Sequence, residues 1–108
     1  MSSSVPFKSM LNKPEVRGSI LRQLIREYEN VLYQYRVKLK TPALTLIDSY
    51  STLGYWKKEV RILGISTHLI ENYDWKIVVE ILKHEMAHQI ADELLGGHSG
   101  HDFIFQQA

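Results

Sequence analysis

The sequence predicts an α+β fold, and the hydrophobic pattern of three stretches carries that prediction. Residues 14–38 and 75–95 repeat apolar side chains at spacings of three and four, which is typical of amphipathic helices. Between them, residues 43–64 are rich in branched and aromatic side chains, which favour strands. We therefore expect a long N-terminal helix, a small three-stranded sheet with a hairpin, and a second long helix packed on it.

The first helix is expected to begin at Pro14, because proline is favoured at the first helical position. Thr41-Pro42 is expected to end it, since the residue before a proline avoids helical backbone. Its apolar stripe consists of Ile20, Leu21, Leu24, Ile25, Tyr28, Val31, Leu32 and Tyr35. Tyr28 and Tyr35 should therefore pack in the core. Residues 1–13 are expected to be a loose leader in front of one domain at 14–108.

The β-type sequence divides into a single strand and a hairpin. Residues 43–49 predict the single strand, and residues 52–64 predict the hairpin, with Lys57-Lys58 between its two apolar halves. Residues 64–72 connect the hairpin to the next element and are expected to include a short helical turn. Trp56 is interpreted as core or sheet-edge packing rather than as a platform for substrate.

The second long helix has clear signals at both ends. Asp74 is a suitable N-cap, and apolar residues then recur from Trp75 to Leu94 at helical spacing. Gly96-Gly97 should end the helix, because glycine is the usual residue just past a helix end. We expect this helix over residues 75–95.

Composition narrows the kinds of site that the chain can build. It has 108 residues and no cysteine, which excludes disulfides and thiolate metal sites, so a metal ion would need His, Asp or Glu ligands. There is no apolar run of 18 residues that could span a membrane, and residues 1–8 lack the long apolar stretch that is typical of a signal peptide. We expect a cytoplasmic location.

Charge is spread unevenly along the chain. The first 40 residues hold eight Lys and Arg against three Glu, a net charge of +5, although the whole chain carries only +1. A basic N-terminal helix could contact nucleic acid. The alternative is an ordinary solvated helix face, which is the commoner reason for such a pattern.

The segment His84-Glu85-Met86-Ala87-His88 lies in the middle of the second helix. Histidines four residues apart lie on one helix face, one turn apart, so both imidazoles can reach one Zn²⁺ ion. Glu85 is offset from His84 by about 100° around the helix axis. Its carboxylate would lie beside the metal, where it can act as general base on a zinc-bound water. This is the H-E-x-x-H pattern of zinc peptidases, the zincins.

Catalytic zinc usually has three protein ligands, and the third must come from elsewhere in the chain. Asp92 shares the face of His88 but lies eight residues from His84, about 12 Å along the axis, so these three side chains cannot meet one ion. Glu93 fails for a similar reason. His98 and His101 follow the Gly96-Gly97 break, where the chain can turn back, and spacing alone does not separate them.

Together, His84 to His88 and the later stretch Ser99-Gly-His-Asp-Phe-Ile-Phe105 resemble the SprT-like zinc metallopeptidase domain. This group includes the Spartan proteases, which act on DNA–protein crosslinks. In the family, a third histidine follows the H-E-x-x-H segment, with an aromatic residue four positions later. His101 with Phe105 matches that pattern better than His98 with Asp102 does, so the resemblance implies His101 as third ligand. The upstream segment Leu53-Gly-Tyr-Trp56 resembles the family's hairpin.

The resemblance implies a zincin-like domain, with zinc held by His84, His88 and His101 and with Glu85 as catalytic base. It covers roughly residues 18–108. The sequence stops soon after Phe105, inside what resembles a new apolar helix, the pattern expected either of a truncated domain or of a minimal family member. Protein or peptide substrates are expected, with DNA contact through the basic helix. His68 is interpreted as a capping or surface histidine rather than a ligand.

Two other functions fit the same residues. The first is a non-peptidase zinc hydrolase such as an amidase, which a narrow closed pocket would favour, whereas an open site along an exposed strand edge would favour a peptidase. The second is a metal-stabilised module that binds DNA or a partner protein and has no catalytic activity.

Overall fold

The computed structural model describes residues 10–96, and its helices and strands follow the predicted order. His98, His101 and Phe105 lie outside the described residues. The elements are α2 (Pro14–Tyr35), β1 (Ala43–Ile47), β2 (Gly54–Lys57), β3 (Ile62–Ser66), α3 (Thr67–Asn72) and α4 (Trp75–Leu94). The α+β fold, with two long helices and a hairpin between them, is confirmed.

The three strands form one sheet in the order β1-β3-β2. β1 pairs with β3 in parallel, and β2 pairs with β3 in antiparallel orientation. The second strand of the hairpin is therefore the central strand, and β2 lies at an edge of the sheet as described. In the antiparallel register Gly54 pairs with Ile65, and Trp56 pairs with Leu63. Side chains alternate between the two faces, so Gly54 and Trp56 share the face of the two buried β3 residues.

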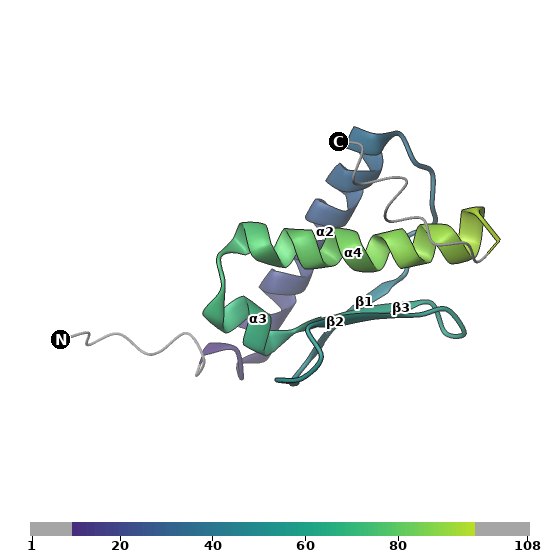
Figure 1. Ribbon diagram of the computed structural model, residues 1–108. Coiled ribbons are helices and arrows are strands. Elements are labelled where there is room, and N and C mark those ends of the chain that lie inside the picture. The colour runs from purple at the N-terminus through teal and green to yellow at the C-terminus, as the bar shows by residue number, and fades with distance from the viewer. Residues whose placement is uncertain (1–9, 97–108) are drawn as a thin grey trace.

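Both long helices lie on the same side of the sheet (Figure 1). α4 packs over β2 and β3, whereas α2 packs against β1 and against α4. The core lies between these elements and takes buried side chains from each of them. Its members include Leu24, Tyr28, Val31, Leu46, Leu63, Ile65, Val78, Leu82 and Met86. Tyr28 is fully buried and Tyr35 packs at the margin of the core, as predicted.

The C-terminal end of α2 differs from the prediction. The helix ends at Tyr35, before the predicted limit of 38 and well before Thr41-Pro42. Arg36 adopts left-handed backbone (φ 57°, ψ 43°), and its N–H donates to the carbonyls of Leu32 and Tyr33. Such a residue closes a helix end through its backbone. The pattern missed it because the residue is arginine rather than the glycine that usually marks this conformation.

The other boundaries agree with the predictions within a few residues. The predicted strand over 43–49 ends at Ile47, and the expected helical turn after the hairpin is α3. Asp74 is the N-cap residue of α4, but its side chain makes no capping hydrogen bond there. Leu11, which falls in the predicted leader, is buried in the core. The division into a leader and a domain stays a prediction.

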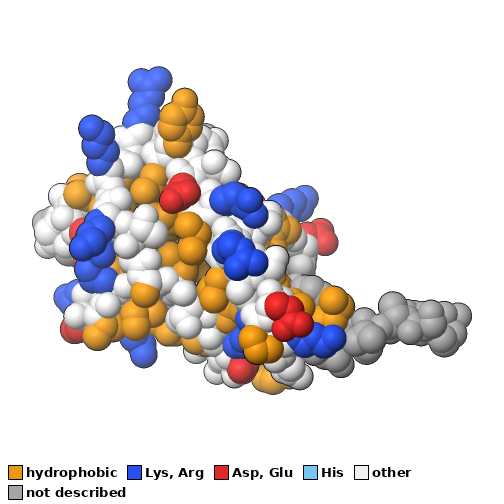
Figure 2. Space-filling model, turned by 180° about the vertical axis from the view of Figure 1, so that it is seen from behind, with side chains coloured by type: hydrophobic (Ala, Val, Ile, Leu, Met, Phe, Trp, Pro, Cys, Tyr) orange, Lys and Arg blue, Asp and Glu red, His pale blue; other side chains and the backbone are white. Residues whose placement is uncertain are grey.

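Two surface properties bear on partners. No helix within residues 10–96 is long and apolar enough to cross a bilayer. Figure 2 shows the face opposite to that of Figure 1, where Lys and Arg side chains are spread among apolar ones rather than gathered in a single cluster.

Candidate metal centre

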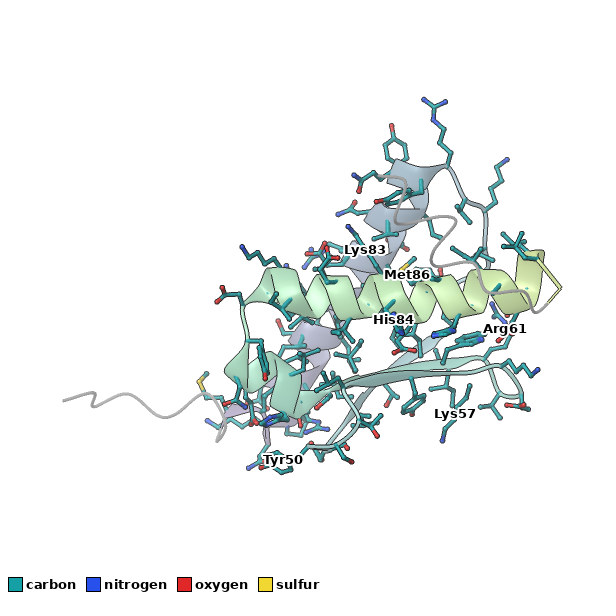
Figure 3. The ribbon with its side chains drawn as sticks, in the orientation of Figure 1. Tyr50, Lys57, Arg61, Lys83, His84 and Met86 are labelled. Atoms are coloured by element: carbon teal, nitrogen blue, oxygen red, sulfur yellow. The ribbon has the colours of Figure 1, made fainter. Side chains whose placement is uncertain are left out.

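The two histidines of the motif meet on one side of α4. His84 and His88 lie one helical turn apart, and their Nε2 atoms are 3.3 Å from each other. The ring centroids are 4.8 Å apart with the rings nearly perpendicular. In Figure 3 His84 lies on the side of α4 that faces the strands, whereas Lys83 and Met86 lie on the other side. The predicted convergence of the two imidazoles is therefore present in the folded chain.

The separation of the two nitrogens fits a shared metal ion. In a tetrahedral zinc site with Zn–N bonds of about 2.0–2.1 Å, two ligand nitrogens lie about 3.3–3.4 Å apart. The observed 3.3 Å between the Nε2 atoms matches that value. A hydrogen bond between the rings is also possible at this distance when one Nε2 carries a proton. The spacing of these two donor atoms is therefore compatible with one shared ion.

Glu85 lies next to this histidine pair, on the face of α4 that contacts β2. The residue is only 8% exposed, and none of the side-chain hydrogen bonds or ion pairs found within residues 10–96 involves its carboxylate, whose oxygens keep contact with solvent. Burial raises the pKa of its carboxyl to about 7. Partial burial disfavours the charged form of a carboxylate, and carboxyl groups in this state are common at functional sites.

The edge strand β2 lies directly against Glu85. A Cβ atom added at Gly54 would stand 3.2 Å from Cγ of Glu85 and 3.1 Å from Cγ2 of Ile81. Both contacts are tighter than ordinary van der Waals distances, so glycine allows the strand to approach the helix this closely. The sequence analysis did not assign Gly54 to the site, although an isolated glycine in a strand is a signal of close backbone approach.

Asp92 and Glu93, which spacing excluded as metal ligands, bind other partners. Asp92 accepts a hydrogen bond from Nε1 of Trp56 at 2.7 Å. Glu93 forms a two-point ion pair with Arg61, with N···O distances of 2.6 and 2.9 Å. The first contact joins α4 to β2, and the second joins α4 to the turn between β2 and β3. Trp56 packs against the core, as predicted.

His68 makes local contacts at the far end of the sheet from this turn. Its Nδ1 lies 3.0 Å from Nδ2 of Asn72, and its ring lies 4.6 Å from that of Tyr50. Ser66, rather than His68, caps α3, because its hydroxyl accepts from the N–H of Leu69. His68 is therefore a partly exposed surface residue, the second of the two roles expected for it.

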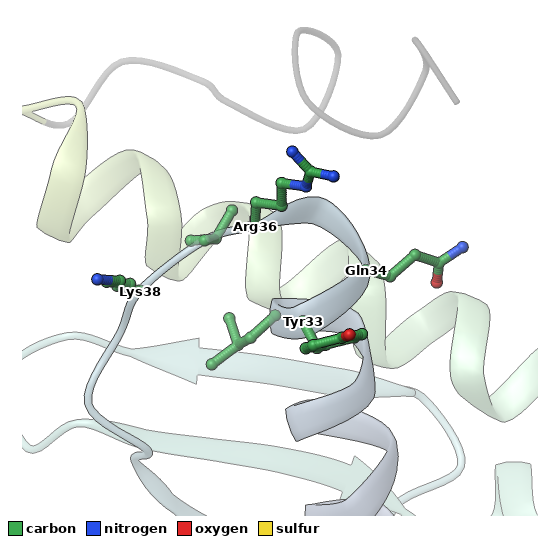
Figure 4. Close-up of a pocket in the computed structure, with 6 residues that line it drawn as sticks. Tyr33, Gln34, Arg36 and Lys38 are labelled. Carbon is green, nitrogen blue, oxygen red and sulfur yellow. The ribbon is translucent and has the colours of Figure 1, made fainter.

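A separate cavity of about 470 Å³ lies at the C-terminal end of α2. Leu32, Tyr33, Gln34, Arg36, Val37 and Lys38 line it (Figure 4). None of the predicted site residues does so. This cavity is therefore a different feature from the histidine pair on α4.

The third ligand lies outside the described residues. Within residues 10–96, no group of three or more His, Asp or Glu side chains could hold an ion. His101 and its alternative His98 follow that range. The choice between them stays a prediction.

Comparison with known proteins identifies the family of the chain. No curated protein matches the sequence. The fold is similar to the crystal structure of the metallopeptidase zymogen of Methanocaldococcus jannaschii jannalysin, with a TM-score of 0.60 and 12% identity over 79% of this chain and 81% of that chain. The model of the SprT-like family matches residues 21–108, most of the sequence. The chain therefore belongs to the SprT-like family.

Proposed function

We propose that this chain is a zinc-dependent peptidase, with His84, His88 and His101 as metal ligands and Glu85 as the general base. The observation that carries the proposal is the convergence of the two Nε2 atoms at 3.3 Å beside a buried glutamate. Membership of the SprT-like family and the fold shared with a metallopeptidase zymogen support a peptidase-type function.

A Zn²⁺ ion held by these imidazoles would acidify an attacking water and polarise the scissile carbonyl. Glu85 follows His84 in the helix, so its carboxylate lies beside the ligands without competing for their position. There it would take the proton from the attacking water and later deliver it to the nitrogen of the leaving amine. The packing of Ile81 and Gly54 around Glu85 restricts solvent on one side of the carboxylate.

The position of β2 favours an extended peptide as substrate. Among the described strands β2 has one neighbour, β3, so its other edge carries backbone groups that a peptide could pair with. Because the backbone at Gly54 lies against Glu85, a peptide added along that edge would pass close to the carboxylate. An open strand edge is what a peptidase needs, and this favours peptide substrates over the small substrates of an amidase.

The decisive experiment compares the effects of two glutamate-to-glutamine substitutions on α4. Zinc-loaded wild-type protein should cleave an unfolded substrate such as casein, and Glu85→Gln should lower the rate about 10²–10⁴-fold, the usual contribution of a general acid or base. Glu80→Gln is the matched control, because Glu80 lies on α4 but is largely exposed and pairs with Lys83 at the surface. Equal activity of Glu85→Gln and wild type would exclude the proposed role.

Contact with DNA through α2 is a separate and weaker part of the proposal. The helix carries exposed basic residues, among them Arg22 and Arg26, but it also carries Glu27 and Glu29. A salt-dependent association with duplex DNA that Arg22→Ala and Arg26→Ala weaken would support it. Binding that is unchanged in both variants would mean that the charges serve only as a solvated surface.

A further inference from the structure

The edge strand β2 is fastened to α4 at two points. At its first residue, Gly54 lies against Ile81 and Glu85. At its third residue, the indole Nε1 of Trp56 donates to Oδ2 of Asp92 at 2.7 Å. Both residues point to the same face of the sheet, so the two contacts hold the strand from one side and leave its outer backbone edge unpaired by any described strand.

The two contacts lie on either side of the second histidine. Glu85, His88 and Asp92 follow one another at spacings of three and four residues, so they share one face of α4. Glu85 and Asp92 are about 10.5 Å apart along the helix axis, with His88 between them. Any tilt or shift of β2 on α4 would therefore change the position of the strand edge relative to His88 and Glu85.

The Trp56 contact is a side-chain hydrogen bond that joins the end of β2 directly to α4. The strand has four residues and pairs only with β3 within the described part of the chain. An N–H donor to a carboxylate at 2.7 Å is a charge-assisted hydrogen bond, which is stronger and more directional than a neutral one. The indole ring also packs against the core. The contact therefore fixes both the height and the direction of the strand over the helix.

We propose that Trp56 and Asp92 are positioning residues that hold the edge of β2 in register with Glu85 and the histidine pair, so that a peptide on this edge presents its scissile bond correctly. This inference rests on the proposed peptidase function and adds residues that act on substrate placement rather than on metal binding. Displacements of about 1 Å in such a site can lower rates about 100-fold.

The chain offers a matched control in the neighbouring pair Arg61–Glu93. This pair also joins α4 to the hairpin through a short polar contact, of 2.6 Å between Nε and Oε2. It holds the turn after β2 rather than β2 itself, and Glu93 is the residue directly after Asp92. An effect that arises only from general loosening of the hairpin should therefore also appear in Glu93→Gln, whereas loss of register at β2 should follow only from changes at Trp56 or Asp92.

The test measures two zinc-directed inhibitors on the zinc-loaded variants. Acetohydroxamate binds the metal alone, whereas acetyl-trialanine hydroxamate also needs the strand edge. Trp56→Phe keeps a ring but loses the donor, and Asp92→Leu loses the acceptor. Both substitutions should lower the affinity for the peptide inhibitor at least 10-fold and the affinity for acetohydroxamate less than 2-fold. Asp92→Asn keeps an acceptor oxygen and should restore most of the affinity, and Glu93→Gln should change neither inhibitor.

Amide hydrogen exchange in residues 54–57 gives a second readout that needs neither metal nor activity. Trp56→Phe and Asp92→Leu should accelerate exchange there at least 10-fold, while Glu93→Gln should not. Unchanged exchange, equal weakening of both inhibitors, or the same losses in Glu93→Gln would overturn the positioning role. Failure of the wild type to cleave casein would count against the proposed function instead, and the exchange measurement would still decide whether the pair holds β2.

Discussion

Glu85 and Gln89 lie one turn apart on α4, and both are buried polar residues with opposite surroundings. Gln89 is fully buried and uses its whole amide: Oε1 accepts from the hydroxyl of Tyr28 at 2.9 Å, and Nε2 donates to Oε1 of Glu93 at 3.1 Å. Glu85 is 8% exposed, and no side-chain hydrogen bond within residues 10–96 involves its carboxylate, which keeps contact with solvent. The polar atoms of Gln89 are therefore satisfied by partners within the protein, and those of Glu85 by solvent.

The difference separates a side chain of α4 that holds the fold from one to which the proposed function assigns chemistry. The amide of Gln89 joins α4 to α2 through Tyr28, across 61 positions of sequence. The carboxylate of Glu85 makes no such contact within residues 10–96, and burial raises its pKa to about 7. A group kept in this state is available to a proton or a ligand, which supports its assignment as the base.

The largest expected effect is the loss of metal binding when one of the proposed histidine ligands near Glu85 is replaced. His84→Ala and His88→Ala should each weaken zinc binding more than about 100-fold, beyond the usual effect of changing groups around a metal ligand. His101→Ala should do the same, and His98→Ala should not. Bound zinc measured after dialysis against a weak chelator checks all four variants. Loss of zinc only in His98→Ala would make His98 the third ligand, and retention in His84→Ala would remove the proposed metal centre.

The next largest effect concerns Tyr28, the hydrogen-bond partner of Gln89, and the stability of the fold at high pH. Burial raises the pKa of Tyr28 to about 12, from an ordinary value of about 10. Below pH 10 both folded and unfolded chains keep the proton, and the full stability is present. Between about pH 10 and 12 only the unfolded chain loses it, so the free energy of unfolding should fall by about 2–3 kcal/mol.

Tyr28→Phe cannot ionise, so its fall in stability over this pH range should be smaller by that amount. Urea unfolding of chelator-treated protein, in steps from pH 8 to 11.5, measures the difference between the variant and the wild type. Because the other tyrosines and the lysines titrate in both proteins, their contributions cancel. Parallel pH profiles would mean that the hydroxyl of Tyr28 ionises as easily in the folded chain as in the unfolded one.

A smaller effect is expected from breaking the amide contacts themselves. Gln89→Leu removes the acceptor of the Tyr28 hydroxyl and leaves that hydroxyl buried without a partner, which costs about 1–3 kcal/mol. The rate of casein cleavage per folded molecule should stay within about twofold of wild type, because no role in the reaction is assigned to Gln89. Thermal unfolding and active-site titration measure the two quantities. If Gln89→Leu lost activity without losing stability, Gln89 would act in the reaction rather than in holding the fold.

Local patterns predicted the features that depend on neighbours in sequence. The spacing of His84, Glu85 and His88 fixes their directions once the helix forms, and the apolar period predicted that helix to within one residue of its end at Leu94. The hairpin and α3 followed in the same way from composition and turn residues. These features needed no knowledge of tertiary packing.

Contacts between distant segments could not be predicted in this way. Periodicity says that Gln89 is buried but not that it meets Tyr28, and it places Trp56 at a sheet edge but not against Asp92. The close approach of Gly54 to Glu85 depends on the height of β2 over α4. The end of α2 at Arg36 was missed because any residue except proline can be forced into left-handed backbone when the surrounding packing favours it.

The smallest expected effect concerns Glu93, which accepts a hydrogen bond from Gln89 and forms an ion pair with Arg61. A hydrogen bond from Arg61 lowers the pKa of Glu93, so this pair stabilises the fold above the ordinary carboxyl pKa and loses its effect as pH falls through the lowered value. Glu93→Gln should therefore cost about 0.2–1 kcal/mol at pH 7, the range of partly exposed ion pairs, and nothing at low pH. Urea unfolding at pH 7 and pH 3 measures the change. A cost of the same size at both pH values would show that the negative charge of Glu93, and hence its ion pair with Arg61, is not the source of the stabilisation.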